Sequence, residues 1–282
     1  MSSVRCVAVD LATFAATAGD WLRREPVLHN VMLTVAQGRV DGDVPAGPDD
    51  RWLRVENGDG TLVGAALRTP PRGPLLSGMP REAARALADW FAGDDLGAVF
   101  GPSDPCGWFA ERYGEVTGTT PVPGMGQRLF RLGGLCPPVG VPGDGRRATR
   151  TDRDLLVAWS DAFAREATPD HPHPDPAEPV DARLRHGGLL WLWEDGGEPV
   201  STAWLTVPVA GVVRVGGVYT PPALRGLGYA SAVVAAASRH ALDSGATDCV
   251  LYTDLANPTS NKIYQAVGYR PVADAQEWRF AP

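Results

Sequence analysis

The chain has 282 residues, of which 44% are hydrophobic, and its 26 Lys or Arg and 33 Asp or Glu give a formal net charge of −7. This length favours two domains, since a typical domain has about 100–200 residues, and the apolar fraction excludes global disorder. The acidic balance, with no basic cluster larger than pairs such as Arg23-Arg24, argues against a nucleic-acid partner.

Cysteine spacing and hydropathy bear on the compartment. The sequence has four widely separated cysteines: Cys6, Cys106, Cys136 and Cys249. Without Cys-x-x-Cys spacing, we expect neither a disulfide framework nor a structural zinc site. Asp10 and Asp20 interrupt the N-terminal apolar residues, unlike a signal peptide. No apolar run reaches the roughly 20 residues of a transmembrane helix. We therefore expect a cytoplasmic protein with neither a metal nor a membrane partner.

A Pro/Gly-rich segment divides the chain almost at its midpoint. Six of the ten residues from 136 to 145 are Pro or Gly, a composition that disfavours helices and central strands. We predict a linker at 136–145 between a first domain, 1–135, and a second domain, 146–282.

The elements of the first half begin at Gly60-Thr61-Leu62-Val63-Gly64, which leads into an apolar, strand-like run. A helical pattern follows Gly78-Met79-Pro80, and a strand is predicted at 96–100. A helix ending in Tyr113-Gly114 and an aromatic-rich strand at 128–132 come next.

The second half starts with a predicted helix over 155–163, where Thr151 and Asp154 have the spacing of a capping box. The turn signal Asp195-Gly196 separates two strands within 189–207.

A strand at 212–219 then leads through a glycine-containing loop into a long helix over 227–243, with Gly245 as its stop signal. A strand at 249–253, a helix ending in an aromatic-Gly pair and a final aromatic-rich strand follow. This order describes an α/β protein with a mixed sheet (α+β) flanked by helices. Because both halves show the same order, we predict a tandem repeat.

The strongest chemical signal is the run Arg225-Gly226-Leu227-Gly228-Tyr229-Ala230, which opens the long helix after a buried strand that ends at Thr220. The free N–H groups of a first helical turn and the helix dipole make an anion site. Arg225 adds a positive charge, so a diphosphate is the natural occupant. A simple tight turn is the alternative. The sequence lacks both the Rossmann pattern with its acidic residue and the Gly-Lys-Ser/Thr of a Walker A loop.

This run resembles the phosphate loop of GNAT-type N-acetyltransferases, Arg/Gln-x-x-Gly-x-Gly/Ala. The second half of their signature, an Asn, a short helix and a Tyr before an aromatic-Gly pair, is matched between Asn257 and Tyr269. The resemblance is closest over 212–280 and extends from residue 146 onward. It implies an enzyme that transfers acetyl from acetyl-CoA to a primary amine by direct attack in a ternary complex.

The resemblance also implies residue roles. The backbone of Val218, Tyr219 and Thr220 would pair with the pantetheine amides of the cofactor. The pyrophosphate would lie against Arg225, Gly226, Leu227, Gly228, Tyr229, Ala230 and Ser231. Asn257 and Asn261 would bind the CoA arm. Tyr264 would face the sulfur and donate a proton or hydrogen bond to the leaving thiolate, although a packed core aromatic is the alternative reading of this residue.

The general base has no fixed position in this family. Glu166, after the first helix of the second half, is the leading candidate, with a solvated surface Glu as the alternative, and Asp254 is the second candidate. His171 and His173 lie in a Pro-rich loop and are expected to be surface residues. Lys262, the only lysine, is expected to be a solvated helix residue, or else to lie near the CoA phosphates.

The first half departs from the pattern after Met79-Pro80, where Arg81-Glu82-Ala83 replaces the glycine loop and Glu82 would repel a pyrophosphate. We therefore expect two GNAT-like domains in tandem, the first a degenerate copy without a cofactor loop. The competing function is a non-catalytic acyl-CoA sensor or scaffold. The sequence leaves open the acceptor (a small-molecule or peptide amine), a longer acyl donor and the oligomeric state.

Overall fold

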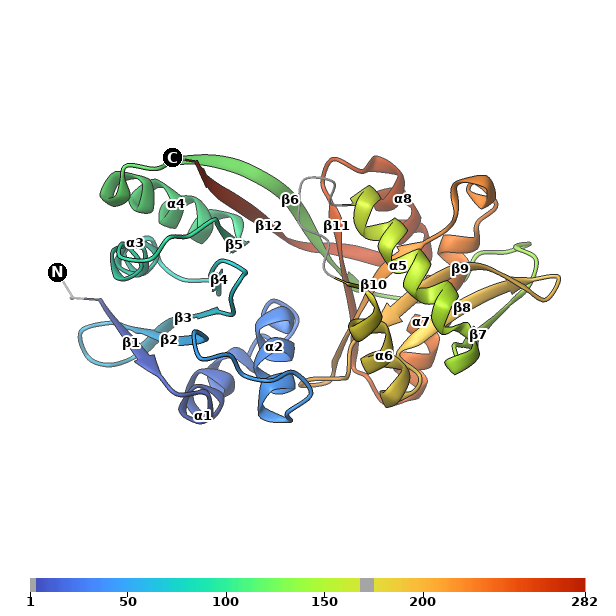
Figure 1. Cartoon of the computed structure of the whole chain (residues 1–282), viewed down its shortest axis with the longest axis horizontal. Helices are drawn as coiled ribbons and strands as arrows, with labels where there is room; N and C mark the ends of the chain where they lie inside the picture. The colour runs from blue at the N-terminus through green and yellow to red at the C-terminus, as the bar shows by residue number, and fades with distance from the viewer. Residues whose placement is uncertain (1–3, 168–174, 282) are drawn as a thin grey trace. The chain divides into compact units, whose positions relative to one another are not determined.

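The structure is a computed structural model that describes residues 4–167 and 175–281, and it contains the same series of elements twice. The first series comprises β1 (Arg5–Val9), α1 (Leu11–Leu22), α2 (Asn30–Val40), β2 (Arg51–Glu56), β3 (Leu62–Arg68), β4 (Leu75–Leu76), α3 (Arg81–Trp90), β5 (Ala98–Pro102), α4 (Ser103–Thr117) and β6 (Thr120–Leu132). The second comprises β7 (Asp144–Arg147), α5 (Arg153–Ala167), α6 (Ala177–His186), β8 (Leu190–Asp195), β9 (Glu198–Leu205), β10 (Val212–Tyr219), α7 (Tyr229–Asp243), β11 (Asp248–Asp254), α8 (Pro258–Val267) and β12 (Tyr269–Ala281), with short 3-10 helices at Arg150–Asp152 and Pro222–Leu224. Figure 1 shows both series. With the 3-10 helices set aside, each reads β, α, α, β, β, β, α, β, α, β, which confirms the predicted repeat of a mixed α/β fold.

The chain divides into two units that each draw on distant parts of the sequence. Unit 1 comprises Met1–Leu129, Asp254–Ala256 and Val272–Pro282, and unit 2 comprises Phe130–Thr253 and Asn257–Pro271. The long strands β6 and β12 therefore contribute residues to both units. Residues 136–143 contain neither helix nor strand, and 144 and 145 begin β7, the last strand in the sheet order. The predicted limits of the two functional domains, 1–135 and 146–282, stay a prediction.

Unit 1 contains a mixed sheet with the strand order β1-β2-β3-β4-β5-β12-β6. Neighbouring strands from β1 to β4 are antiparallel, β4 runs parallel to β5, and β12 runs antiparallel to β5. Helices α3 and α4 close a core that contains Leu53, Val55, Leu87, Phe91 and Phe109. Arg128 and Asp274 join β6 and β12 through two hydrogen bonds of 2.7 and 2.8 Å.

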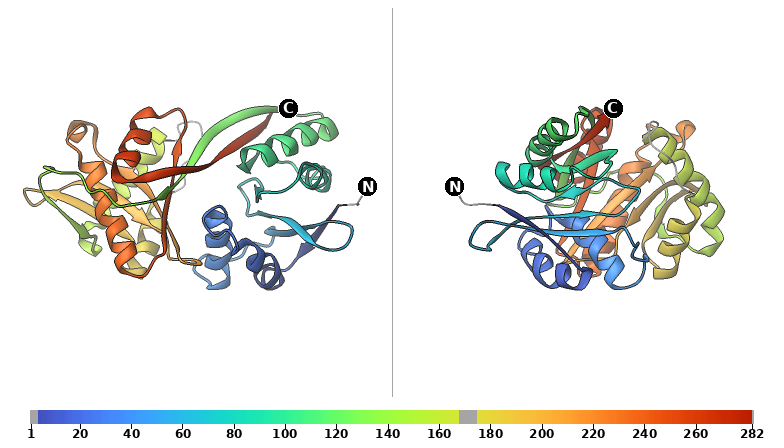
Figure 2. Two further views of the ribbon diagram at one scale, coloured as in Figure 1. Left: turned by 180° about the vertical axis from the view of Figure 1, so that it is seen from behind. Right: turned by 60° about the vertical axis from the view of Figure 1, so that its left-hand side comes forward.

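Unit 2 has the strand order β11-β10-β9-β8-β7, with parallel pairing between β10 and β11 and antiparallel pairing elsewhere. Helices α5 and α6 cover one face of this sheet, and α7 covers the other with α8 beside it (Figures 1 and 2). Side chains alternate between the two faces because successive strand residues point in opposite directions. Ala203 and Leu205 of β9 belong to the core under α7, whereas Trp204 packs with the core under α5 and α6.

The start of α5 differs from the sequence expectation. The capping box is formed by Thr149 and Asp152, around the 3-10 turn, and not by Thr151 and Asp154. Asp152 accepts two hydrogen bonds from Arg146 of β7, at 2.7 and 2.8 Å, and another from the Thr149 backbone N–H at 2.7 Å. These bonds, led by those from Arg146, lower the pKa of Asp152 to about 2. Helix α5 begins at Arg153, two residues before its predicted start, and Asp152 joins the preceding turn to the edge strand β7.

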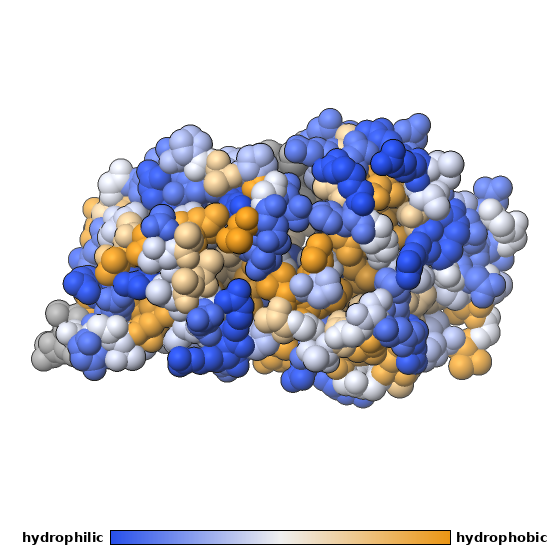
Figure 3. Space-filling view, turned by 90° about the horizontal axis from the view of Figure 1, so that it is seen from below, coloured by the Kyte–Doolittle hydropathy of each residue, from blue (hydrophilic) through white to orange (hydrophobic). Residues whose placement is uncertain are grey.

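Large hydrophobic side chains are exposed at many separate positions in the described part of the chain. No helix there is long and apolar enough to span a membrane. On the face seen in Figure 3, patches of hydrophobic residues alternate with hydrophilic ones. The exposed large hydrophobic residues are scattered along the sequence, from Leu28 to Val272.

Candidate functional site

Strand β10 leaves its parallel neighbour partway along its length. Its ladder with β11 runs from Val212 opposite Asp248 to Val215 opposite Leu251, and within the described residues it is not continued by the last four residues of β10. On its other side β10 pairs with β9, where Gly216 lies opposite Trp204 and Tyr219 opposite Thr202, with a register shift between the two pairs. The backbone of Val218 and Tyr219 on the β11 side is therefore outside the sheet ladder, as expected for a strand that pairs with a ligand's amides.

The end of β10 is fixed from the β9 side. The Ser201 hydroxyl donates to the Tyr219 carbonyl at 3.1 Å and lies 2.9 Å from the Thr220 hydroxyl. Ser201 is fully buried, and Tyr219 and Thr220 are each 8% exposed. Because one edge is held by buried hydrogen bonds, the opposite edge is presented in a defined position.

The loop between β10 and α7 has the backbone shape of an anion site. Gly226 and Gly228 have φ angles of +81° and +87°, in the left-handed region that favours glycine. Gly228 is the N-cap of α7, where no side chain caps the helix and the first turn contains no acidic residue. The first N–H groups, from Tyr229 to Ser231, therefore lack intrahelical partners. Such N–H groups, together with the helix dipole, are suited to binding an anion, and the anion site at this loop stays a prediction.

Arg225 lies at this loop, folded back on the end of the strand. Its Nε donates to the Thr220 carbonyl at 2.9 Å, and its guanidinium carbon lies 5.8 Å from the centroid of the Tyr219 ring. Its Nη2 makes a 2.6 Å ion pair with Glu166 of α5. The side chains of Arg225 and Glu166 are 48% and 45% exposed, so the pair contributes little to stability but sets the direction of the guanidinium.

The helix start is also tied to the β8–β9 hairpin. The Tyr229 hydroxyl donates a 2.5 Å hydrogen bond to Asp195, and the Tyr229 side chain is buried. This bond and burial raise the pKa of Tyr229. The side chain of Tyr229 is therefore structural, and its contribution to a bound anion would be its backbone N–H. Sequence reasoning missed this contact because the two residues are far apart in the chain.

Helix α8 places Tyr264 against the core under α7. Asn257 caps the helix, since its Oδ1 accepts from the Ser260 N–H at 3.0 Å, and Asn261 donates to the Asn257 carbonyl at 2.9 Å. Tyr264 meets Tyr269 edge to face, with ring centroids 6.4 Å apart.

The Tyr264 phenol is in a state suited to hydrogen-bond donation. Burial raises the pKa of Tyr264 to about 12, so the phenol stays protonated at neutral pH. Its hydroxyl makes no hydrogen bond to any residue in the ranges 4–167 and 175–281. A phenol that keeps its proton and has no hydrogen-bond partner among the described residues can donate a hydrogen bond to a ligand atom.

Of the other residues named as candidates in the sequence, Lys262 is exposed. Asp254, at the end of β11, accepts a 2.8 Å hydrogen bond from the Ala256 N–H. His171 and His173 lie outside the described residues. Over the described ranges, no group of three or more His, Cys, Asp or Glu could hold a metal ion.

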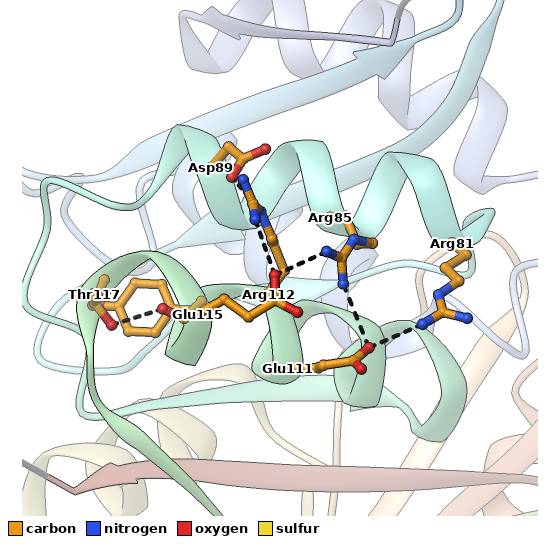
Figure 4. A network of polar contacts seen from close by, with 8 residues as sticks. Arg81, Arg85, Asp89, Glu111, Arg112, Glu115 and Thr117 are labelled. Carbon is orange, nitrogen blue, oxygen red and sulfur yellow. Dashed lines mark hydrogen bonds and ion pairs between the residues drawn. The ribbon is translucent and has the colours of Figure 1, made fainter. Parts of the chain in front are cut away.

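The corresponding helix of unit 1, α3, starts differently. It follows Pro80 without a side-chain cap and has Glu82 in its first turn. Strand β4 before it has two residues, against eight in β10. The arginines of α3 are held by α4 carboxylates: Arg81 bonds to Glu111 at 3.1 Å, and Arg85 bonds to Glu115 at 2.9 Å (Figure 4).

Comparisons with known proteins agree with this geometry. Residues 156–269 match the model of the acetyltransferase (GNAT) family. Among solved structures, a GNAT-family acetyltransferase from Colwellia psychrerythraea is similar with a TM-score of 0.61 and 11% identity, covering 99% of this chain and 100% of that chain. A GCN5-related N-acetyltransferase from Sphaerobacter thermophilus has a TM-score of 0.65 and 16% identity, covering 98% and 95%. A tandem GNAT protein from the clavulanic acid biosynthesis pathway has a TM-score of 0.57 and 12% identity, covering 98% of each chain. No curated protein matches the sequence.

At these identities the solved structures show the fold, and the family model adds a match that lies almost entirely in unit 2. Both parts of the predicted signature, the loop from Arg225 to Ser231 and Tyr264 on α8, lie within the matched residues. The chain thus has the tandem GNAT fold over nearly its full length, and its residues 156–269 match the family model of the GNAT acetyltransferases.

Proposed function

We propose that the protein is an N-acetyltransferase that moves the acetyl group of acetyl-CoA to a primary amine of a small molecule or peptide. The observation that carries this proposal is the combination, within unit 2, of an uncapped helix N-terminus, an edge of β10 outside the ladder and a protonated Tyr264. The three features fit the pyrophosphate, the pantetheine arm and the sulfur of one cofactor.

Cofactor binding in this proposal uses backbone groups first. The pyrophosphate accepts hydrogen bonds from the N–H groups of Tyr229, Ala230 and Ser231, with Arg225 as the nearby cation. The pantetheine amides pair with the backbone of β10 as an added strand. Asn257 and Asn261 would contact the CoA arm only with atoms that the α8 cap leaves available.

The reaction is a direct transfer. The lone pair of the amine nitrogen attacks the thioester carbon, the carbon–sulfur bond breaks, and its electron pair leaves with the sulfur of CoA. The amine gives up one proton, which ends on solvent or on the departing thiolate. Because a pKa of about 12 for Tyr264 lies well above the ~8.5 of an ordinary thiol, Tyr264 donates a hydrogen bond to the thiolate and keeps its own proton.

Glu166 is still the proposed base, and its ion pair with Arg225 gives it a second role in orienting that guanidinium. The alternative function, a non-catalytic sensor of acyl-CoA, would need the phosphate loop and β10 but not the phenol of Tyr264. The available proton of that phenol favours catalysis.

The test is CoA-thiol release from acetyl-CoA over a panel of primary amines, with calorimetric binding of acetyl-CoA measured in parallel. We expect binding, together with thiol release that at least one amine accelerates. Binding without acceleration by any amine would favour the sensor, and absence of binding would reject the assigned loop.

A further inference from the structure

Two arginine side chains converge on one indole ring on the α5/α6 face of unit 2. The guanidinium carbon of Arg183, from α6, lies 4.5 Å from the centroid of the Trp204 ring, and that of Arg214, from β10, lies 6.0 Å from it. The strand neighbours of Trp204 and Arg214 belong to the core under α7, so these two side chains point to the opposite face. All three residues are partly exposed.

The indole lies where β10 leaves β11. A Cβ on Gly216 would come within 2.3 Å of the Trp204 ring, and one on Gly217 within 2.1 Å, so the two glycines leave the space that the ring occupies. Gly217 also has a φ of +53°. Arg214 lies opposite Val250, one residue before the end of the β10–β11 ladder. Arg183 and Arg214 therefore lie beside the place where the pairing between β10 and β11 ends.

The Arg183 charge is not matched by a carboxylate in the described ranges. Its one hydrogen bond goes to the Pro179 carbonyl at 3.3 Å, although a guanidinium has five N–H donors. Asp181 on the same helix is taken by Arg153, with bonds of 2.7 and 2.9 Å. Burial, followed by the charge of Arg214, lowers the pKa of Arg183 to about 10, so it stays cationic at neutral pH. Stacking on the indole leaves the N–H edge for a ligand.

Tyr264 and the arginine pair lie on opposite faces of the sheet of unit 2. Tyr264 packs with the core under α7, whereas the arginine pair lies on the face covered by α5 and α6. An acceptor that comes from the arginine side would attack the thioester from the face opposite the hydrogen-bond donor to the sulfur.

On the basis of the acetyl transfer proposed above, we infer that the acceptor amine also carries an anionic group, a carboxylate or a phosphate, which Arg183 binds beside Trp204, where Arg214 adds a second positive charge. Both anions accept paired hydrogen bonds from the planar guanidinium edge. The anion fixes one end of the acceptor, and the amine at its other end reaches the thioester carbon.

The test compares amines in matched pairs: 4-aminobutyrate with 4-aminobutanamide, glycine with glycinamide, and O-phosphoethanolamine with ethanolamine. We expect kcat/KM for thiol release to favour the anionic member of at least one pair by tenfold or more. Preference in the first two pairs identifies a carboxylate, and preference in the third identifies a phosphate. Since an amide lowers the pKa of a nearby amine and so raises the reactive fraction, a preference for glycine over glycinamide would not come from amine basicity.

Two variants give the matched control. Arg183→Gln should lower kcat/KM for the anionic member by about 10- to 100-fold, as expected for a lost charge-assisted bond, and leave the neutral member and acetyl-CoA affinity within about twofold. Arg185→Gln makes the same charge change on the same helix at an exposed position and should leave both members unchanged.

Equal use of both members of every pair, or an equal loss for both members in Arg183→Gln, would overturn the inference. If no amine is acetylated, the proposed function fails separately. Calorimetry of 4-aminobutyrate and O-phosphoethanolamine with CoA-saturated protein then decides the anion site: binding that Arg183→Gln removes supports it, and absence of binding overturns it.

Discussion

Replacing Gly228 by Ala perturbs the phosphate loop at its most constrained position. Gly228 is the N-cap of α7 with a φ of +87°, and an added Cβ would lie 2.7 Å from Cγ2 of Val141. The left-handed conformation costs a non-glycine residue roughly 1–2 kcal/mol. Because the Val141 contact adds to this strain, the backbone is expected to move away from its present conformation, and the N–H groups of the first turn move with it.

The expected loss of affinity follows from those N–H groups. A hydrogen bond to a charged phosphate contributes roughly 1.5–3 kcal/mol, so misplacing one such donor should weaken acetyl-CoA binding by about 10- to 150-fold. Calorimetric titration with acetyl-CoA measures this change, and thermal unfolding measures the accompanying loss of stability.

The control for this variant is Gly245→Ala, after the other end of α7. Gly245 has a φ of +96°, and an added Cβ there would meet no atom within 4 Å. It should lose stability through the same backbone strain and keep wild-type affinity. If Gly228→Ala binds acetyl-CoA as tightly as Gly245→Ala does, the anion site is not at this loop.

Three further outcomes follow from the structure. Glu166→Gln should raise KM for acetyl-CoA through the lost ion pair with Arg225 and lower kcat through the lost base; unchanged kinetics would remove both roles. Asp152→Asn should lower the free energy of unfolding by about 1–2 kcal/mol at pH 7. Because the folded pKa of Asp152 is depressed to about 2, the difference should shrink as pH falls from about 4 toward 2, and a difference that persists at pH 2 would reject the linkage. Calorimetry should give one acetyl-CoA per chain, since α3 begins with Glu82 and without the glycine loop; two per chain would show that unit 1 retains a site.

Elements specified by nearby residues could be predicted from the sequence. Strand β10 has the predicted bounds, and α7 begins two residues after its predicted start and ends where expected, because alternating or helical apolar spacing ends there at Gly and Pro. The Gly226–Gly228 loop was found for the same reason: its positive φ angles require glycine.

Elements that depend on distant partners were missed or shortened. Strand β6 runs over Thr120–Leu132, although its first half is rich in Pro and Gly and gave no strand signal. It is stabilised by pairing with β12, as in the bond from Gln276 to the Gly124 carbonyl at 3.1 Å. Helix α6 was not predicted either.

The parts of the site that the sequence did not reveal are likewise non-local. Glu166 meets Arg225 across 59 residues, and the Tyr229–Asp195 bond spans 34. The arginine pair at Trp204 depends on α6 and two strands. No residue spacing encodes such contacts, because they exist only once the sheet has set which side chains share a face.

Acetyl transfer itself is tested most directly by following the acetyl group. The protein is incubated with trideuteroacetyl-CoA and an amine that accelerates thiol release, and mass spectrometry locates the label. We expect the label on the amine nitrogen, forming at least tenfold more slowly in Tyr264→Phe, with acetyl-CoA affinity unchanged. Label that stays on CoA with every amine, in protein that binds acetyl-CoA, would contradict catalysis and leave the sensor as the function.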